Sequence, residues 1–536
     1  QGLGQRVMTR AVRNALSRAP DLPEWVDPEL RARRTWPGWR EALETAHHPR
    51  GTGDLSPSVA ARERLAYDEL FAHQMTLALA RRNVRRQRGR ETGGDGALRA
   101  RVLDALPYRP TGAQARALEE IAADMDAPHR MNRLLQGDVG SGKTLVALLA
   151  MLIAVEAGGQ AAMMAPTEIL ARQHAANLAP LAAEAGVRLA VLTGRDRGAD
   201  RAELLGGLAS GEIGIVLGTH ALFQSDVGFH DLRLAVIDEQ HRFGVRQRMD
   251  LSAKGDSTDV LVMTATPIPR SLTLAQYGDM DLSVLDEKPP GREPVDTVLV
   301  SSARIDEVVA HLDTALAEGR QAYWVCPLVE ESEAAPLSAA EARRAILAER
   351  LGEARVGLMH GQMAPHAKDA AMADFVEGRT RLLVATTVIE VGVDVPAASI
   401  MVIESAQSFG LAQLHQLRGR VGRGGGRATC LLLYDPPLGE TARARLETMR
   451  RTEDGFAIAE EDLRLRGAGD LLGLQQSGLP RFRIADLESQ QDLMEVARDD
   501  ARLLVERDPD LASPRGDAAR TLLWLMERDL SLIHIS

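Results

Sequence analysis

This chain of 536 residues has only two cysteines, no long apolar run and no excess of positive charge. The two cysteines, Cys326 and Cys430, are too few for a disulfide framework. The N-terminus lacks the apolar core of a signal peptide, and no apolar run reaches the roughly 18 residues of a transmembrane helix. We therefore expect a protein of a reducing cytoplasm that has no membrane partner.

The net charge of −11 argues against a uniformly basic surface. It does not exclude nucleic acid as a partner, because a local basic stripe is enough to bind phosphates. A hydrophobic content of 45% and a charged content of 26% are ordinary for globular protein. The length leaves room for roughly three to four domains.

The first 105 residues carry no catalytic pattern and are expected to form helices and irregular segments. Apolar residues recur at helical spacing from residue 58 to 82, and six arginines lie within residues 81–90. Two interpretations stay open for these arginines: a solvated helix end that leads into a linker, or an arm that contacts phosphates. Residues 91–96 have the composition of a linker.

From about residue 106, short apolar runs alternate with helical stretches, which is typical of parallel α/β sheets. Pro289-Pro290-Gly291 separates two such series. The fold class is therefore α/β, with tandem sheet domains at 106–290 and 291–450 and a further region at 451–536. The expected strands are 161–165, 213–217, 234–237 and 260–263 in the first series and 322–326, 381–384 and 400–403 in the second.

Residues 137–144 read Gly-Asp-Val-Gly-Ser-Gly-Lys-Thr, the complete pattern of a phosphate-binding loop. Its glycines let successive N–H groups point at phosphate oxygens, Lys143 adds a positive charge, and the Thr144 hydroxyl can ligate Mg²⁺. A helical pattern follows up to Gly158-Gly159, so the loop opens onto a helix N-terminus, which favours an anion. The predicted nucleotide-binding residues are Gly137, Asp138, Val139, Gly140, Ser141, Gly142, Lys143 and Thr144.

Polar clusters follow two expected strands of the first series. Asp238 can hold Mg²⁺ through water, and Glu239 beside it can orient or deprotonate an attacking water. Thr264-Ala265-Thr266 follows the next strand, and its hydroxyl groups can bond toward the carboxylates or a neighbouring domain. Because ligands of α/β sheets bind at such strand ends, we expect these groups to face the nucleotide.

The second series has no phosphate loop, so it must contribute something different. Residues 413–423 concentrate charge on an expected short helix and turn, in which Arg420 and Arg423 are three residues apart and share a helix face. Two such arginines can reach one phosphate together. ATP bound between the two halves would then draw them together and hydrolysis would release them, which is a motor stroke.

In order and spacing, these motifs resemble those of superfamily 2 helicases, whose motor consists of two RecA-like domains. The resemblance implies catalytic roles in motifs I, II and VI for Lys143, Asp238, Glu239, Gln416, Arg420 and Arg423. Residues 106–114 resemble the segment in which a glutamine, here Gln114, reads adenine. Motifs Ia, Ib, II, III and V imply DNA-binding or coupling roles for Thr167, Thr219, His220, His241, Thr264, Thr266 and Thr386.

Three stretches resemble the RecG family in particular: residues 236–245 with Gln240, residues 454–473, and the helical lead-in at residues 61–70. This resemblance implies an ATP-dependent DNA helicase that remodels stalled forks and Holliday junctions. Its implied cofactors are ATP and Mg²⁺, and its implied partners are duplex and branched DNA. A monomer at the nucleoid of the bacterial cytoplasm, with single-stranded DNA-binding protein as a further partner, is also expected.

Residues 454–473 resemble the helical translocation hairpin of this family. Arg464 and Arg466 are the expected DNA-binding or coupling residues of the hairpin. Phe456, Ala459 and Leu463 lie at helical spacing, so we expect them to anchor one face of its first helix.

The sequence departs from the family pattern at both ends. Chains of this family begin with a larger domain that contains an OB-fold wedge, and we expect residues 1–105 to hold only its trailing end. On that expectation, DNA stimulates the ATPase with little preference for a fork over linear duplex. Residues 530–536 do not resemble the family.

Two alternative functions stay open beside the RecG resemblance. One is a transcription-repair coupling translocase of the Mfd type, which has a similar motor but acts on RNA polymerase. The other is a nucleotide-dependent DNA clamp without turnover. An RNA helicase is disfavoured, because the stretch after motif VI resembles a hairpin of duplex-DNA motors.

Overall fold

The computed structural model describes residues 4–86, 89–239, 257–265, 280–289, 293–327, 335–386, 395–424, 426–466, 482–486 and 490–528. The chain divides into two compact units. The helical unit comprises Gln1–Arg86, Pro269–Met280 and Arg466–Ser536, and the two-sheet unit comprises Gln87–Ile268 and Asp281–Leu465. Among the described residues, the helices lack the combination of length and apolarity that a bilayer crossing requires.

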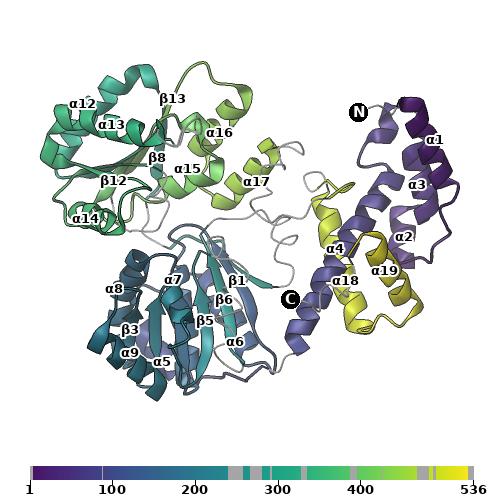
Figure 1. Cartoon of the computed structure of the whole chain (residues 1–536), viewed down its shortest axis with the longest axis horizontal. Helices are drawn as coiled ribbons and strands as arrows, with labels where there is room; N and C mark the ends of the chain where they lie inside the picture. Colours follow the sequence, from purple (N-terminus) through teal and green to yellow (C-terminus); the bar gives the residue numbers. More distant parts are fainter. Residues whose placement is uncertain are drawn as a thin grey trace. The chain divides into compact units, whose positions relative to one another are not determined.

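The first sheet of the two-sheet unit has seven strands in the order β3-β4-β2-β5-β6-β1-β7, and every pair is parallel. Its strands are β1 (Asn132–Gly137), β2 (Gln160–Met164), β3 (Leu189–Leu192), β4 (Ile215–Gly218), β5 (Leu232–Ile237), β6 (Asp259–Thr264) and β7 (Asp281–Leu285). Its helices are α5 (Ala97–Ala105), α6 (Gly112–Met125), α7 (Lys143–Glu156), α8 (Glu168–Ala185) and α9 (Gly198–Ser210) (Figure 1). Residues 145–154 of α7 are all buried, as expected for a helix that is apolar all round.

The second sheet has six strands in the order β10-β11-β9-β12-β13-β8, again all parallel. Its strands are β8 (Val295–Ser301), β9 (Gln321–Val325), β10 (Val356–Met359), β11 (Leu382–Ala385), β12 (Ala398–Ile403) and β13 (Ala428–Tyr434). Its helices are α12 (Ile305–Ala317), α13 (Ala335–Leu351), α14 (Pro365–Val376), α15 (Leu411–Arg418), α16 (Glu440–Arg451) and α17 (Gly455–Arg466). Tyr323 and Trp324, neighbours on β9, belong to two different core clusters, because successive side chains of a strand point to opposite faces.

The helical unit joins segments from both ends of the sequence. It contains α1 (Gln5–Leu16), α2 (Pro28–Arg34), α3 (Trp39–His47), α4 (Ala60–Arg86), α18 (Gln491–Arg507) and α19 (Pro514–Leu525), and α4 runs beside α18 in Figure 1. The buried Asp68 of α4 accepts hydrogen bonds from Trp25 Nε1 at 2.7 Å and Arg64 Nε at 2.9 Å. Glu69 accepts from the backbone N–H groups of residues 483–485 at 2.6 to 3.0 Å, which holds this segment against α4.

Short 3-10 turns connect several of these elements. They are η1 (Thr52–Leu55), η2 (His220–Phe223), η4 (Ser302–Arg304), η5 (Glu353–Arg355) and η7 (Ala406–Ser408).

The predicted fold class of two tandem parallel α/β sheets is confirmed, and each expected strand lies within two residues of an observed one. The prediction for the hairpin helix α17 is partly wrong. Its buried face consists of Ile458, Ala459 and Asp462, whereas Phe456 and Leu463 are only half-buried. The spacing of apolar residues alone did not identify this face, because a polar residue, Asp462, forms part of it.

Candidate nucleotide site and its links to the second sheet

The predicted motifs of the first sheet meet at one edge. Lys143 follows β1, Thr167 follows β2, Thr219 follows β4, Asp238 follows β5, and Thr264 ends β6. Because all these strands are parallel, their carboxyl ends lie along the same edge, where α/β sheets bind ligands. Parallel pairing of the strands therefore brings residues as far apart in sequence as Lys143 and Thr264 to one edge of the sheet.

The phosphate loop needs its glycines for space as well as for backbone conformation. Gly140 and Gly142 adopt φ angles of 78° and 86°, in the left-handed region that favours glycine. A Cβ at Gly142 would lie 2.1 Å from Nε2 of Gln114, and a Cβ at Gly137 would lie 2.6 Å from Oγ of Ser141. A larger residue would therefore force the Gln114 side chain to move at position 142, and the Ser141 side chain at position 137.

Gln114 fixes the start of α6 and touches the loop. Its Oε1 accepts from the backbone N–H of Thr111 at 2.9 Å, in a capping box that defines the helix N-terminus. Its Nε2 donates to the carbonyl oxygen of Ser141 at 2.8 Å. The residue predicted to read adenine is thus buried directly beside the phosphate loop.

Lys143 turns back onto the loop that carries it. Its Nζ donates to the carbonyl oxygens of Gly137 at 2.7 Å and Asp138 at 2.8 Å. The side chain is buried, so these carbonyl groups replace the water that would otherwise solvate the ammonium group.

The charges around Lys143 come from three different elements. Burial lowers the pKa of its ammonium group, and the carboxylates of Glu239, Asp238 and Asp138 act in the opposite direction. The positive charge of Arg423, from the second sheet, lowers the same pKa further. These effects show that the phosphate loop, the carboxylates after β5 and an arginine after α15 share one electrostatic environment.

Asp238 is held by a histidine that sequence analysis did not identify. Its Oδ2 lies 2.9 Å from Nε2 of His174 on α8, and its Oδ1 accepts from the backbone N–H of Glu239 at 3.1 Å. Glu239 has a φ angle of 52°, a left-handed backbone that is uncommon for a non-glycine residue and typical of functional turns. No motif in the sequence singles out His174, because its contact arises from the packing of α8 against the sheet.

Thr144 and Asp238 supply oxygen atoms of the kind that Mg²⁺ binds. Thr144 stands in the first turn of α7 beside Lys143, whose pKa responds to the Asp238 carboxylate. Mg²⁺ is commonly held by one or two protein oxygens together with phosphate oxygens. The hydroxyl of Thr144 and the carboxylate of Asp238 fit that donor set.

The arginines of the second sheet do not lie on a helix, so the predicted shared helix face is wrong. α15 ends at Arg418, and Arg420 and Arg423 follow it in a turn. Arg420 is buried, and Nε of Arg423 donates to the carbonyl oxygen of Gly419 at 3.1 Å. The turn, rather than the helix, directs these side chains.

This turn approaches the phosphate loop closely. A Cβ at Gly419 would lie 3.0 to 3.3 Å from the side-chain atoms of Val139. His415, on α15, places Nε2 2.5 Å from Oδ1 of Asp138. Gln416, next to His415, is half-buried. The sequence analysis missed His415 as a site residue, although it lies within the charged stretch 413–423.

The residues predicted to bind DNA or couple to it lie in several different settings. Thr167 caps α8 by accepting from the backbone N–H of Leu170 at 3.3 Å, and His220 is exposed at the start of η2. Thr219, Thr264 and Thr386 are buried at strand ends.

Arg464 is exposed and forms an ion pair with Glu461 on its own helix, with Nη2 and Oε1 2.6 Å apart. The side chain of Arg466 lies outside the described residues, as do His241, Thr266 and Gln240. The segment 387–394 of motif V, the hairpin residues 467–473 and the tail 530–536 also lie outside them.

The arginine-rich stretch 81–90 is partly paired with acids. Arg82 Nη2 lies 3.0 Å from Oδ1 of Asp510, and Arg90 Nη1 lies 2.7 Å from Oδ1 of Asp231. These pairs favour the linker interpretation for Arg82 and Arg90. The side chains of residues 83–88 lie outside the described part of the chain.

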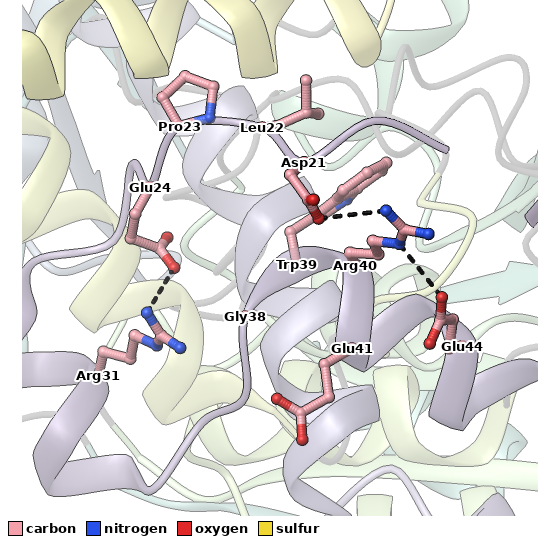
Figure 2. Close-up of a pocket in the computed structure, with 10 residues that line it drawn as sticks. All are labelled: Asp21, Leu22, Pro23, Glu24, Arg31, Gly38, Trp39, Arg40, Glu41 and Glu44. Carbon is pink, nitrogen blue, oxygen red and sulfur yellow. Dashed lines mark hydrogen bonds and ion pairs between the residues drawn. The ribbon is translucent and has the colours of Figure 1, made fainter. Parts of the chain in front are cut away.

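A pocket of about 340 Å³ in the helical unit contains none of the predicted site residues (Figure 2). Four acids and two arginines line it, and the arginines are already paired: Arg31 with Glu24 at 3.2 Å, and Arg40 with Asp21 at 3.3 Å and Glu44 at 3.2 Å. The acidic excess makes this pocket unsuited to a phosphate.

Family models match three consecutive parts of the chain. Residues 111–274 match DEAD/DEAH box helicases, residues 304–425 match the helicase conserved C-terminal domain, and residues 452–533 match the C-terminal part of domain 3 of ATP-dependent DNA helicase RecG. The ATP-dependent DNA helicase RecG of Escherichia coli K12 is 48% identical over 501 residues, which cover 92% of this chain and 72% of that protein. The chain belongs to the RecG family.

Another RecG, from Bacillus subtilis, is 46% identical over 506 residues, which cover 94% of this chain and 74% of that protein. A solved structure of RecG bound to a three-way DNA junction is 42% identical, with a TM-score of 0.73 over 92% of this chain. The chain spans 65% of the length of the RecG chain in that structure. Membership in the RecG family confirms the resemblance, and the two matched helicase domains are those of an ATP-dependent helicase.

Proposed function

We propose that this chain hydrolyses ATP between its two sheets and uses the cycle to move along duplex DNA and remodel branched DNA. The observation that carries the proposal is the approach of α15 and the turn after it to the phosphate loop. His415 lies 2.5 Å from Asp138, and the Arg423 charge acts on Lys143. A γ-phosphate in this loop would therefore meet groups from both sheets.

Each charged group then has a role that follows from its position. Lys143 holds the β- and γ-phosphates, and Glu239 orients the attacking water. Arg420 and Arg423 stabilise the negative charge that spreads over the transferred phosphoryl group, with Gln416 beside them. Gln114 recognises adenine next to the loop, where its amide lies close to Ser141.

Mg²⁺ is proposed to bind at Thr144 and Asp238. When bound, it would neutralise phosphate charge and orient the phosphate oxygens. His174 holds the Asp238 carboxylate through a contact of 2.9 Å, which restricts its orientation toward such a site.

Branched DNA is the proposed substrate because a homologous RecG was solved on a three-way junction. The strand-end residues Thr167, Thr219, Thr264 and Thr386, with His220 and Arg464, are proposed to contact DNA or transmit motion. Contacts from motor domains of this kind are made mainly to phosphates. We also propose that the chain is a monomer at the nucleoid of the bacterial cytoplasm. Single-stranded DNA-binding protein is proposed as a further partner.

A strand-displacement assay tests this function. With ATP and Mg²⁺, the wild-type chain should release a labelled strand from a three-way junction, and the Lys143→Ala variant should release none. Junction affinity should fall steeply with salt, because phosphate contacts release counterions. Wild-type protein that hydrolyses ATP but releases no strand, and instead displaces a stalled RNA polymerase, would favour the Mfd-type function.

A further inference from the structure

The first helix of the helical unit, α1, carries three arginines on one face. Arg6, Arg10 and Arg13 stand at positions i, i+4 and i+7, which lie on the same side of a helix. Together with Thr9 and Asn14 they line a hollow of about 470 Å³ on the surface of this unit. All five lining residues are polar and exposed. We call the three arginines the α1 stripe.

The positive charge of the α1 stripe is not neutralised within the described part of the chain. Residues 1–20 contain no aspartate or glutamate, and the three guanidinium groups form no ion pair with a described acid. Elsewhere in the same unit arginines do pair with acids, as Arg34 does with Glu63 at 3.1 Å and Arg64 with Asp68 at 2.9 Å. The α1 stripe therefore keeps a positive potential that an anion can neutralise.

The helix that carries the stripe has little support from the rest of its unit. Among the described side chains of α1, only Leu16, at its last position, is buried. A helix of 12 residues is only marginally stable in water by itself. Repulsion between like charges at i and i+4 weakens it further. A ligand that neutralises the arginines would therefore also stabilise the helix.

The spacing of the stripe matches the backbone of a nucleic acid strand. With a rise of about 1.5 Å per residue, Arg6 and Arg13 are about 10 Å apart along the helix axis. One DNA strand has a phosphate about every 3.4 Å along its axis, so each arginine can reach a different phosphate. A guanidinium group donates two parallel hydrogen bonds to phosphate oxygens. Thr9 and Asn14 add side chains of the kind that also donate to phosphates.

The opposite face of α1 is apolar and exposes Val7, Met8 and Val12. A helix that is basic on one face and apolar on the other can also lie on an anionic membrane. Such membrane helices carry Trp, Phe or Leu on the apolar face. α1 has no aromatic residue, and its single leucine, Leu16, is buried in the protein. A hollow lined only by polar residues and arginines therefore favours a DNA strand.

We propose that the α1 stripe is a phosphate-binding surface for the DNA substrate, separate from the contacts of the two-sheet unit. This inference rests on the proposed function, because it takes DNA as the substrate. The stripe contacts backbone phosphates and no bases, so it adds affinity without sequence preference. ATP hydrolysis in the absence of DNA does not depend on it.

The salt dependence of DNA binding measures the number of phosphate contacts. The dissociation constant of a labelled three-way junction is measured by fluorescence anisotropy at several salt concentrations. In the triple variant Arg6→Gln, Arg10→Gln, Arg13→Gln, the slope of its logarithm against that of salt concentration should fall by about 0.9 for each lost contact. The corresponding triple lysine variant should keep the wild-type slope, because each lysine still neutralises one phosphate. ATP turnover without DNA should stay at the wild-type rate in both variants.

The matched control removes three positive charges from the same unit but from separate elements. It combines Arg33→Gln, Arg483→Gln and Arg520→Gln, all at exposed positions, and its salt slope should equal that of the wild type. Hydrogen exchange gives a second readout. The amides of residues 5–16 should exchange more slowly when the junction binds to the wild type, because bound phosphates stabilise α1. In the triple glutamine variant the junction should leave their exchange unchanged.

An unchanged salt slope in the triple glutamine variant would overturn the inference, and so would a lysine variant whose slope falls equally. Arginine-dependent binding to vesicles that contain phosphatidylglycerol, with an unchanged DNA slope, would assign the stripe to a membrane instead. Each of these results leaves the proposed function standing as long as the wild type releases strands. An arginine-dependent slope in a wild-type chain that hydrolyses ATP but releases no strand would refute the proposed function and support the stripe.

Discussion

Lys143 donates from its ammonium group to the carbonyl oxygen of Gly137, 2.7 Å away, so the last part of the phosphate loop is bonded to the first. The bond keeps a buried positive charge solvated by the loop. A phosphate would compete with the carbonyl groups for the same hydrogens, and it would add full negative charges. The lysine is therefore held close to the place where it is needed.

Lys143→Ala should lower ATP turnover by at least about a hundredfold, because it removes the cation that stabilises the phosphates. The fold should persist, since an alanine fits without steric conflict at the start of α7. Lys368→Ala is the matched control, because Lys368 also bonds a loop carbonyl but is only half-buried. ATPase rates and circular dichroism check this, and unchanged turnover in folded protein would contradict the assignment.

Glu239→Gln should separate nucleotide binding from hydrolysis. Glutamine keeps the size of the side chain but cannot take a proton from water, so ATP affinity should persist while turnover falls by about a hundredfold or more. Calorimetric titration with ATP, beside a phosphate-release assay, gives both quantities. Glu212→Gln, an exposed change in the same sheet domain, should leave both at wild-type values. Normal hydrolysis in Glu239→Gln would assign the water to another residue.

Arg423→Ala and Arg420→Ala should each lower ATP turnover by roughly 10³-fold with little change in nucleotide affinity. The reason is that these residues, from the second sheet, act on charge that develops during phosphoryl transfer. Because Arg420 is buried, its variant also needs a melting curve. The exposed Arg427→Ala tests for a general effect of losing one positive charge nearby. If both variants turn over like wild type, the two sheets do not share the γ-phosphate.

Local patterns predicted the phosphate loop and the strands well, because both depend on residues that are neighbours in sequence. The loop needs glycines at fixed spacing, and a buried strand needs a short apolar run. The positions of Asp238 and Thr264 at one edge then follow from parallel pairing alone. These parts of the site could be predicted before any coordinates were known.

Contacts between distant elements could not be predicted in this way. His174 meets Asp238, and His415 meets Asp138 across 277 positions of sequence. Neither histidine has a local pattern that differs from that of an ordinary helix residue. The end of α15 at Arg418 was missed for a related reason, since the turn that follows is stabilised by bonds from Arg418 to carbonyls near residue 450.

Stability should also depend on pH through Asp259, which begins β6. Its Oδ1 accepts from the backbone N–H of Met131 at 2.7 Å, and burial raises the pKa of its carboxyl group to about 7 from 3.8. Between these two values the folded chain keeps a proton that the unfolded chain has lost. The free energy of unfolding therefore falls as pH rises through this window, and the loss is complete above the folded-state pKa.

Asp259→Asn removes this dependence, because the amide stays neutral and its oxygen can still accept from Met131. Relative to the variant, the wild type should lose up to about 1.4 kcal/mol per pH unit within the window and nothing further above it. Chemical unfolding at several values between about pH 5 and pH 9 measures the difference, and contributions from all other groups cancel in it. Asp104→Asn, an exposed change on α5, is the control. Its free energy of unfolding should change with pH as that of the wild type does. If the free energy of unfolding of Asp259→Asn also changes with pH as that of the wild type does, the Asp259 carboxyl group is ionised throughout this range. Burial then does not control its protonation.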